Sequence, residues 1–442
     1  MRLGWLGAAS LAALGCAPAP LDLGRNDDAG ADVSLAPAAG RIALGRRTTM
    51  VIAGDGSVWA WGEDGNGQLA IPPRLATESC DLPPGPTDCF VRPARVPALS
   101  GVSQIELGLD HGCALRGGRV LCWGLNLFGA VGGGMAWDDP GPTPIDVGID
   151  DAVAIATGDH ASCAVHADGT VSCWGLALGG MFGVPDASLG SCTVAAPWVA
   201  RHELTLTAGA VLPCALAPII VPGLTDVVGV AMGRAHLCAL RGDGQIICMG
   251  SAERGQLGDG SSTGVMRTPV LAAGDGVGLA AGSVHTCARR DADLLCWGAD
   301  GLGQAGVLPA PASCGLEPCV PTATVLAPIG AGELLAVAAG DQHTCVVVGT
   351  DAHCFGNADG DAAGMRDEGC AGGPCRTVLA GPVVGGVSPA IDGGHDHTCA
   401  IALDGAVLCW GSGHAGELGA GVMVMSATPI RVELTDLSLI HI

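Results

Sequence analysis

Short apolar segments separated by turns recur along the chain from about residue 45 onward. One kind of segment, such as Val227 to Met232, leads into a glycine, and another, such as Pro429 to Val432, follows a glycine-rich loop. Between them lie two further apolar segments joined by a tight turn. Short runs bounded by Gly, Asp and Pro predict strands. Each unit therefore predicts about four strands, which is the content of one β-propeller blade.

One phrase marks the two middle strands of each unit. It reads Gly, two residues, His, any residue, Cys, a turn, and then Cys, usually an aromatic residue, and Gly. Five copies that carry the histidine begin at Gly108, Gly233, Gly282, Gly340 and Gly394. The unit that begins at Gly158 has Ala161 at the histidine position. The unit that begins at Gly45 has Met50 and Ala60 at the two cysteine positions.

Repeats at a fixed period of this length predict units that stack on one another. The seven copies predict an all-β protein, a seven-bladed β-propeller of four-stranded blades over residues 38–442.

The phrases resemble the regulator-of-chromosome-condensation repeat family over roughly residues 38 to 442. The resemblance implies a seven-bladed propeller. The family name also implies guanine-nucleotide exchange on a small GTPase bound to chromatin, but no residue of this chain can be assigned to that activity. Some secreted β-lactamase inhibitory proteins resemble the same family, which implies an enzyme-blocking surface as an alternative.

The 21 cysteines are sorted by the repeat into ten pairs and one remainder, Cys16. Six predicted disulfides lie within units: Cys113 with Cys122, Cys163 with Cys173, Cys238 with Cys248, Cys287 with Cys296, Cys345 with Cys354, and Cys399 with Cys409. Four more lie in the segments after the aromatic residue and glycine: Cys80 with Cys89, Cys192 with Cys214, Cys314 with Cys319, and Cys370 with Cys375. The alternative is that the cysteines are free and serve as small apolar core residues.

Turn chemistry supports the pairing within units. Where the two cysteines are ten residues apart, centring a hairpin between them leaves three loop residues with Gly last, as in Ala167-Asp168-Gly169. Where they are nine apart, two loop residues remain, as in Gly117-Gly118. Both loops suit tight hairpins, so the two cysteines face each other in either case.

The N-terminus predicts export. A short charged start is followed by an apolar stretch from Leu3 to Leu14 and then Gly15-Cys16, which resembles a bacterial lipoprotein signal. We therefore expect a signal peptide over residues 1–15, lipidation of Cys16, and a flexible tether over residues 16–37 that is rich in Ala, Pro, Asp and Gly. The predicted location is the outer membrane or cell surface, through a lipid anchor; ordinary secretion or a periplasmic location is the alternative.

Charge and composition narrow the partners. The formal net charge is −23, and all 20 basic residues are arginine. An acidic surface repels phosphate backbones, which argues against a nucleic-acid partner. No glycine-rich stretch ends in the Gly-Lys-Ser/Thr sequence of a phosphate loop, and no Gly-x-Ser-x-Gly elbow is present.

The repeated histidines are the first candidates for chemistry: His111, His236, His285, His343 and His397. A metal site needs three or four converging ligands, whereas these residues recur once per unit. We therefore expect them to bond to backbone within or between blades, and we expect no metal, no cofactor and no catalytic residue. Zinc at the Cys-x4-Cys segments and a carboxylate pair in the central channel are the alternatives.

The longest insertions follow the aromatic residue and glycine in units one, three, five and six. Because they occupy the same position in the repeat, we expect them on one face of the ring. Aromatic residues at rigid loop tips are common interface anchors, and the candidates are Phe90, Phe128, Trp137, Phe182 and Trp198. The alternative is that they pack onto neighbouring blades.

The sequence thus predicts a non-enzymatic scaffold of the cell envelope, a monomer that binds a protein partner through its insertion-rich loops. A secreted inhibitor of an extracytoplasmic enzyme, a carbohydrate-binding or catalytic propeller, and an exchange factor are the alternatives.

Overall fold

A computed structural model describes residues 40–434 apart from 73–77, 83–84, 136, 195–208, 308, 358–361, 365–375 and 378–381. The chain divides into a unit of residues 1–33 and a unit of residues 34–442, and every described residue belongs to the second. The predicted signal peptide, the lipidation site Cys16 and the predicted tether lie outside the described residues. Within these residues, no helix is long and apolar enough to cross a membrane.

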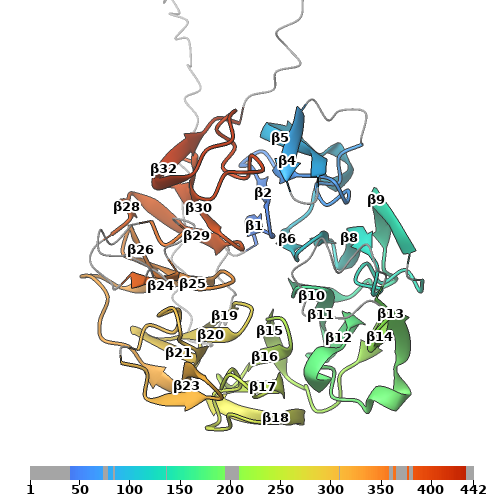
Figure 1. Ribbon diagram of the computed structural model, residues 1–442, viewed down its shortest axis with the longest axis vertical. Coiled ribbons are helices and arrows are strands. Elements are labelled where there is room, and N and C mark those ends of the chain that lie inside the picture. Colours follow the sequence, from blue (N-terminus) through green and yellow to red (C-terminus); the bar gives the residue numbers. More distant parts are fainter. Residues whose placement is uncertain are drawn as a thin grey trace, which may run out of the picture. The chain divides into compact units, whose positions relative to one another are not determined.

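The described strands form seven antiparallel sheets, one for each predicted unit (Figure 1). Blades 1 to 3 comprise β1 (Ile42–Leu44), β2 (Thr48–Ile52), β3 (Val58–Glu63), β4 (Glu78–Leu82), β5 (Gly85–Arg95); β6 (Gln104–Leu107), β7 (His111–Arg116), β8 (Arg119–Asn126), β9 (Trp137–Asp146); and β10 (Ala152–Thr157), β11 (Ala161–His166), β12 (Val171–Leu176), β13 (Gly190–Thr193), β14 (Val211–Ile220).

Blades 4 to 7 follow in the same order. They comprise β15 (Val227–Met232), β16 (His236–Arg241), β17 (Ile246–Ser251), β18 (Val265–Ala273); β19 (Gly278–Ala281), β20 (His285–Arg290), β21 (Asp293–Ala299), β22 (Ala312–Cys314), β23 (Glu317–Val325); β24 (Leu334–Ala339), β25 (His343–Val348), β26 (Asp351–Asn357), β27 (Arg376–Thr377), β28 (Val384–Gly385); and β29 (Val387–Gly393), β30 (His397–Ala402), β31 (Val407–Gly411), β32 (Ser426–Val432). Short 3-10 turns are η2 (Pro97–Leu99), η3 (Leu178–Gly180) and η4 (Asp186–Ser188).

Blades 1, 3 and 5 differ from the predicted four-stranded form by a fifth strand, and in blade 6 two short strands, β27 and β28, both pair with β26. The insertions of blades 1, 3 and 5 form hairpins in which β4, β13 and β22 pair with β5, β14 and β23, the outer strands of these blades. The insertions are therefore extensions of the sheets rather than free loops.

The first strands of neighbouring blades contact one another around the whole ring, and β29 of blade 7 contacts β1 of blade 1. The Leu44 backbone nitrogen donates a hydrogen bond to the Asp392 carboxylate across this last junction, at 2.8 Å. In the described residues each blade is built from consecutive strands, so packing of blade 7 on blade 1 closes the ring.

The two faces of the ring carry different connections. The turns between the second and third strands of each blade, such as Leu403-Asp404-Gly405 after β30, lie on what we call the turn face. At the other end of these strands, His397 of β30 pairs with Gly411 of β31. The segments after the third strand leave at that end together with the loops before the second strand, and we call it the insertion face.

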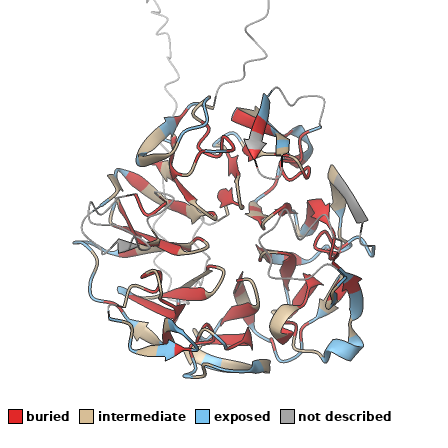
Figure 2. Ribbon diagram, in the orientation of Figure 1, coloured by how far each residue is buried: buried red, intermediate tan, exposed pale blue. Residues whose placement is uncertain are grey.

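Buried side chains lie along the inner strands, whereas outer strands such as β18 alternate between intermediate and exposed positions (Figure 2). The largest fully buried side chains are the aromatic residues of the repeat phrase, among them Trp61, Trp123, Trp174, Trp297 and Trp410. Each of these indoles donates a hydrogen bond of 2.8 to 3.0 Å to a backbone carbonyl of the preceding blade, as Trp410 does to Ala362. The tryptophans therefore bind each blade to the one before it.

Nine disulfides join the described cysteines, each between the partners that the sequence predicted. The six pairs within blades lie directly opposite each other in the register of the second and third strands. In blade 1 the same register places Met50 opposite Ala60. The predicted pair Cys370 with Cys375 lies outside the described residues.

The glycine that opens each repeat phrase is explained by a close approach between blades. A Cβ built on any of these seven residues would lie no more than 2.6 Å from the carbonyl oxygen of the equivalent glycine in the next blade. We call them the ring glycines: Gly45, Gly108, Gly158, Gly233, Gly282, Gly340 and Gly394. Each ring glycine contacts the next one along the ring, and Gly394 contacts Gly45. A side chain at any of them would therefore push two blades apart.

Candidate functional site

The repeated histidines link neighbouring blades. In each case the imidazole Nε2 lies 2.8 to 3.0 Å from a hydroxyl of the following blade: His111 to Ser162, His236 to Thr286, His285 to Thr344, His343 to Thr398, and His397 to Thr49. The histidines therefore link blades as expected, but the partner of Nε2 is a side-chain hydroxyl and not the backbone that we expected.

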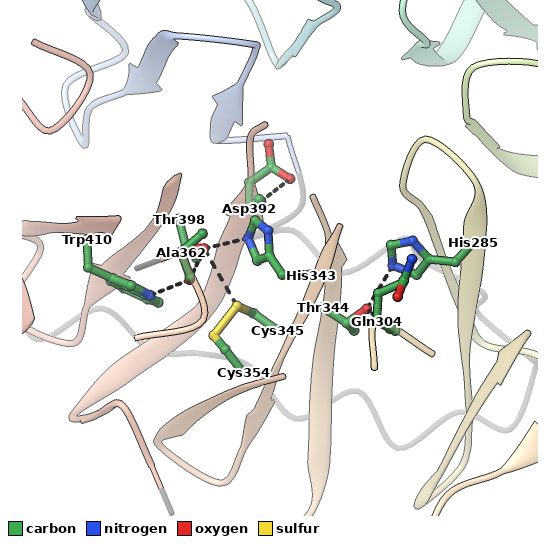
Figure 3. The surroundings of a disulfide bond; sticks show 11 residues. His285, Gln304, His343, Thr344, Cys345, Cys354, Ala362, Asp392, Thr398 and Trp410 are labelled. Atoms are coloured by element: carbon green, nitrogen blue, oxygen red, sulfur yellow. Dashed lines mark hydrogen bonds between the residues drawn. A yellow bond between two sulfur atoms is a disulfide. The ribbon is translucent and has the colours of Figure 1, made fainter. Parts of the chain in front are cut away.

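The direction of this hydrogen bond follows from the hydroxyl's other contact. Thr398 donates to the Ala362 carbonyl at 3.0 Å, which is the carbonyl that also accepts from Trp410 (Figure 3). A hydroxyl has one proton to donate, so His343 must donate from Nε2. Burial lowers the pKa of His343 to about 4, so the ring is neutral at physiological pH. The same carbonyl is therefore held by two donors from the next blade.

The links occur only where both partners are present in the sequence. Blades 1 and 3 have Thr48 and Ala161 at the histidine position, and the blades after them have Gly112 and Leu237 at the hydroxyl position. At the junction of blades 3 and 4, buried apolar residues take the place of the link, with Phe182 and Met249 in one cluster with Leu237. A comparison of each unit with the next one would have found this pairing in the sequence.

Replacing one such histidine is expected to destabilise the ring. His285→Ala removes a fully buried ring and leaves the Thr344 hydroxyl without its donor, so we expect a loss of about 2 to 4 kcal/mol in the free energy of unfolding. Chemical denaturation measures it. His414→Ala, at an exposed position, is the matched control and should change little. Equal stability of the two variants would contradict the assigned role.

The same histidine predicts a pH dependence. Burial lowers the pKa of His285 to about 3 from its ordinary 6.5. As the pH falls, the unfolded chain therefore binds a proton at His285 before the folded chain does. The stability that the neutral His285 contributes is progressively lost below about pH 6.5. His285→Gln cannot titrate. The stability gap between the native chain and this variant should therefore shrink from pH 7 to pH 5 in denaturation at each pH. A constant gap would count against a neutral buried imidazole.

A cavity of about 590 Å³ opens on the insertion face at the axis of the ring. Its wall includes the residue after each ring glycine: Arg46, Leu109, Asp159, Arg234, Ser283, Asp341 and His395. Glu317 and Pro318 of the blade 5 insertion also line it, which places it on the insertion face. We call this cavity the mouth. Beneath the mouth, the ring glycines surround a narrower part of the channel, which has a volume of about 90 Å³.

His395 is a cation in the mouth. Burial alone would lower the pKa of His395, but its 2.7 Å hydrogen bond to Asp396 and the charge of Asp341, 3.3 Å away, outweigh burial and raise the pKa to about 9. Across the channel, burial and the charge of Asp341 raise the pKa of Asp159 to about 6, although Arg234 and His395 act in the opposite direction. The mouth is thus poorly solvated and its charges interact strongly.

Two further carboxyl groups lie on the first strands, which surround the channel. Burial raises the pKa of Glu106 to about 8 and the pKa of Asp392 to about 7. Gln104 donates a hydrogen bond to Glu106, and Asp392 accepts one from the Leu44 backbone nitrogen. Both carboxyl groups therefore have structural partners. In the part of the chain that the structure describes, no three His, Cys, Asp or Glu side chains form a metal-binding group.

The predicted aromatic anchors are not exposed where their side chains are described. Phe90 is 6% exposed, and Phe128 and Phe182 are each 1% exposed. Each packs into an apolar cluster of the blades, Phe128 with the disulfide of Cys192 and Cys214, for example. The prediction that these three contact a partner is wrong, because their large apolar rings are buried against neighbouring strands and blades. The Trp137 side chain and Trp198 lie outside the described residues.

Among the described residues, Leu316 is the most exposed large apolar side chain; the segments after third strands also expose Met135, Val211 and Val422. Leu316 lies at the tip of the hairpin of β22 and β23, between Cys314 and Cys319, and is fully exposed. Gly315 before it has φ +65°, as the first position of a tight hairpin turn of this kind requires. The disulfide holds this turn, and the Glu317 side chain after it forms an ion pair with Arg254. Leu316 therefore stands on a braced tip beside the mouth, which sequence reasoning missed.

Sequence comparison agrees with the repeat. The regulator of chromosome condensation (RCC1) repeat matches residues 55–115, and a second form of it matches residues 41–68, 227–256 and 390–417. Together with the seven sheets, these matches support a propeller of the RCC1 type. The chain is an RCC1-like propeller.

Curated relatives and solved structures agree with this. The chain is 26% identical to protein pim1 of Schizosaccharomyces pombe over 52% of this chain and 40% of the relative. It is 26% identical to the ultraviolet-B receptor UVR8 of Arabidopsis thaliana over 75% of this chain and 70% of that protein. The crystal structure of Prp20p from Saccharomyces cerevisiae superposes with a TM-score of 0.68 at 20% identity, covering 90% of this chain and 89% of that one. The match thus spans two fifths of the length of pim1. The likeness to Prp20p shows the fold alone.

Proposed function

We propose that this RCC1-like propeller is a non-enzymatic scaffold that binds a protein partner through its insertion face. Leu316 is the observation that carries the proposal. An exposed leucine on a disulfide-braced turn loses little conformational entropy on binding, and such pre-organisation favours affinity. Solved RCC1 structures include one described as bound to Kap60, and the Prp20p structure is described together with binding to Gsp1p and histones. Protein binding is therefore a use to which this type of propeller is put.

A substitution on each face tests the proposal. Leu316→Asp places a charge at the tip on the insertion face, and Leu403→Asp places one on an exposed turn of the turn face, where Leu403 is 65% exposed. We expect Leu316→Asp to reduce co-purification of the partner by tenfold or more, about 1.4 kcal/mol of binding free energy, and Leu403→Asp to leave it unchanged. Equal capture by both variants would contradict a binding site at Leu316.

We further propose that the propeller is exported and anchored at the cell surface by a lipid on Cys16. The nine disulfides support export, because such bonds persist in oxidising compartments. Mass spectrometry of the mature N-terminus should find a diacylglycerol-modified Cys16. An unmodified Cys16, or cleavage at another residue, would refute the anchor while leaving the binding face untouched.

A further inference from the structure

The mouth differs in charge from the rest of the protein. The chain as a whole has a formal net charge of −23, whereas the ionised groups that line the mouth are four cations and three carboxylates: Arg46, Arg234, Arg254 and His395 against Asp159, Glu317 and Asp341. The charges that line the mouth are therefore nearly balanced, so the mouth repels an anion far less than the rest of the acidic surface does.

The lining charges are not all engaged with each other. Arg254 forms an ion pair with Glu317, and His395 forms ion pairs with Asp341 and Asp396. Arg234 differs from these, because no side chain among the described residues accepts a hydrogen bond from its guanidinium. Its backbone is fixed, since the Arg234 nitrogen donates to the Ser283 carbonyl at 3.0 Å. The fork of donors on a guanidinium matches the two oxygens of a carboxylate.

The remainder of the wall is mostly uncharged. Leu109, Val284, Leu302 and Pro318 supply apolar surface, and Gln304 and Gln342 supply amides. The volume of about 590 Å³ lies within the range of small-ligand sites. We propose that the mouth binds a carboxylate carried on a body that is part apolar and part amide, with Arg234 as the residue that receives the carboxylate.

Two sources have this chemistry, namely a free organic acid and the carboxyl end of a protein chain. Only in the second case does the inference rest on the proposed function, with the partner's chain end in the mouth and Leu316 at its rim. The two proposals remain separable: failure of an acid probe to bind overturns only the carboxylate site, whereas loss of capture on replacing Leu316, with the acid probe still bound, concerns only the partner.

The experiment uses N-acetyl-leucine and its amide, N-acetyl-leucinamide, as probes for the folded full-length protein. In calorimetric titration we expect the acid to bind saturably and at least tenfold more tightly than the amide. Arg234→Gln should lose that preference, and Arg119→Gln, an exposed arginine paired with Asp146 on the turn face, should keep it. Absence of saturable binding by the acid, equal binding of the amide, or an unchanged preference in Arg234→Gln would overturn the proposal.

Two further arms sharpen the test. Asp159→Asn removes a carboxylate that Arg234 and Arg46 influence, so it should tighten binding of the acid at pH 7.5; weakened or unchanged binding would count against an anion at this place. N-acetyl-Ala-Ala-Leu is compared with N-acetyl-leucine to separate the sources. Tighter binding of the peptide acid assigns the site to a chain end, and tighter binding of the single amino-acid derivative assigns it to a free acid.

Discussion

Alanine at position 282 is expected to destabilise the propeller by about 3 kcal/mol, because overpacking against rigid backbone is costly. The new Cβ would meet the Gly340 carbonyl oxygen of the next blade on one side and the His285 ring on the other. The Gly340 carbonyl belongs to the backbone of the next blade, and the His285 ring is hydrogen-bonded to the Thr344 hydroxyl at 2.9 Å. Neither group can therefore move freely. Any relief requires blades 5 and 6 to separate, which also disturbs the other junctions of a closed ring.

Urea denaturation of Gly282→Ala beside Gly54→Ala measures this effect. Gly54 lies in an exposed turn of blade 1 where a Cβ would meet no atom within 4 Å, so its replacement should be neutral or slightly stabilising. Matching midpoints for the two variants would show that the ring glycines are not held by contact between blades.

Removal of one disulfide within a blade is the second large expected effect. The double variant Cys287→Ala with Cys296→Ala should lose about 2 to 3 kcal/mol, because a loop of this length constrains the unfolded chain by that amount in the chain-entropy model. Cys287 and Cys296 are both fully buried, and the Cys287 sulfur also contacts the Thr344 hydroxyl of the next blade at 3.7 Å. The loss should therefore reach the junction between blades.

The comparison is the double variant Cys314→Ala with Cys319→Ala, which removes the disulfide of the exposed hairpin. Because this hairpin lies at the edge of the sheet, we expect the free energy of global unfolding to change less than for the buried pair. Protection of the paired residues of β22 and β23 from hydrogen exchange should fall instead. A larger global loss from the hairpin variant than from the buried pair would contradict the assigned roles.

The fold was predictable because the repeat fixes strand, turn and pairing together. The spacing of nine between Cys113 and Cys122 predicted a two-residue turn, and Arg116 does pair with Arg119 across Gly117-Gly118. The spacing of ten between Cys163 and Cys173 predicted a turn one residue longer. Val165 pairs with Val171, which centres the turn on the three residues Ala167-Asp168-Gly169. Local turn geometry and long-range pairing give the same answer at these positions, so reading the pattern was sufficient.

The site was less predictable, because burial depends on what the rest of the chain places around a residue. Phe90, Phe128 and Phe182 follow the third strands of their blades. Phe128 packs against the insertion of blade 3 and Phe182 packs against blade 4, so neighbouring blades help to bury them. Leu316 could have been found from the sequence, because it is an apolar residue in a turn between two closely spaced cysteines. The mouth gave almost no signal in the sequence, since its charged residues come from six units and only the ring brings them together.

The central claim is that partners bind on the insertion face at Leu316. A photo-activatable amino acid at position 316, compared with one at position 403, tests it in the producing cell. We predict a discrete crosslinked adduct from position 316 and none from position 403. Adducts from position 403 alone, or equal adducts from both positions, would contradict the claim.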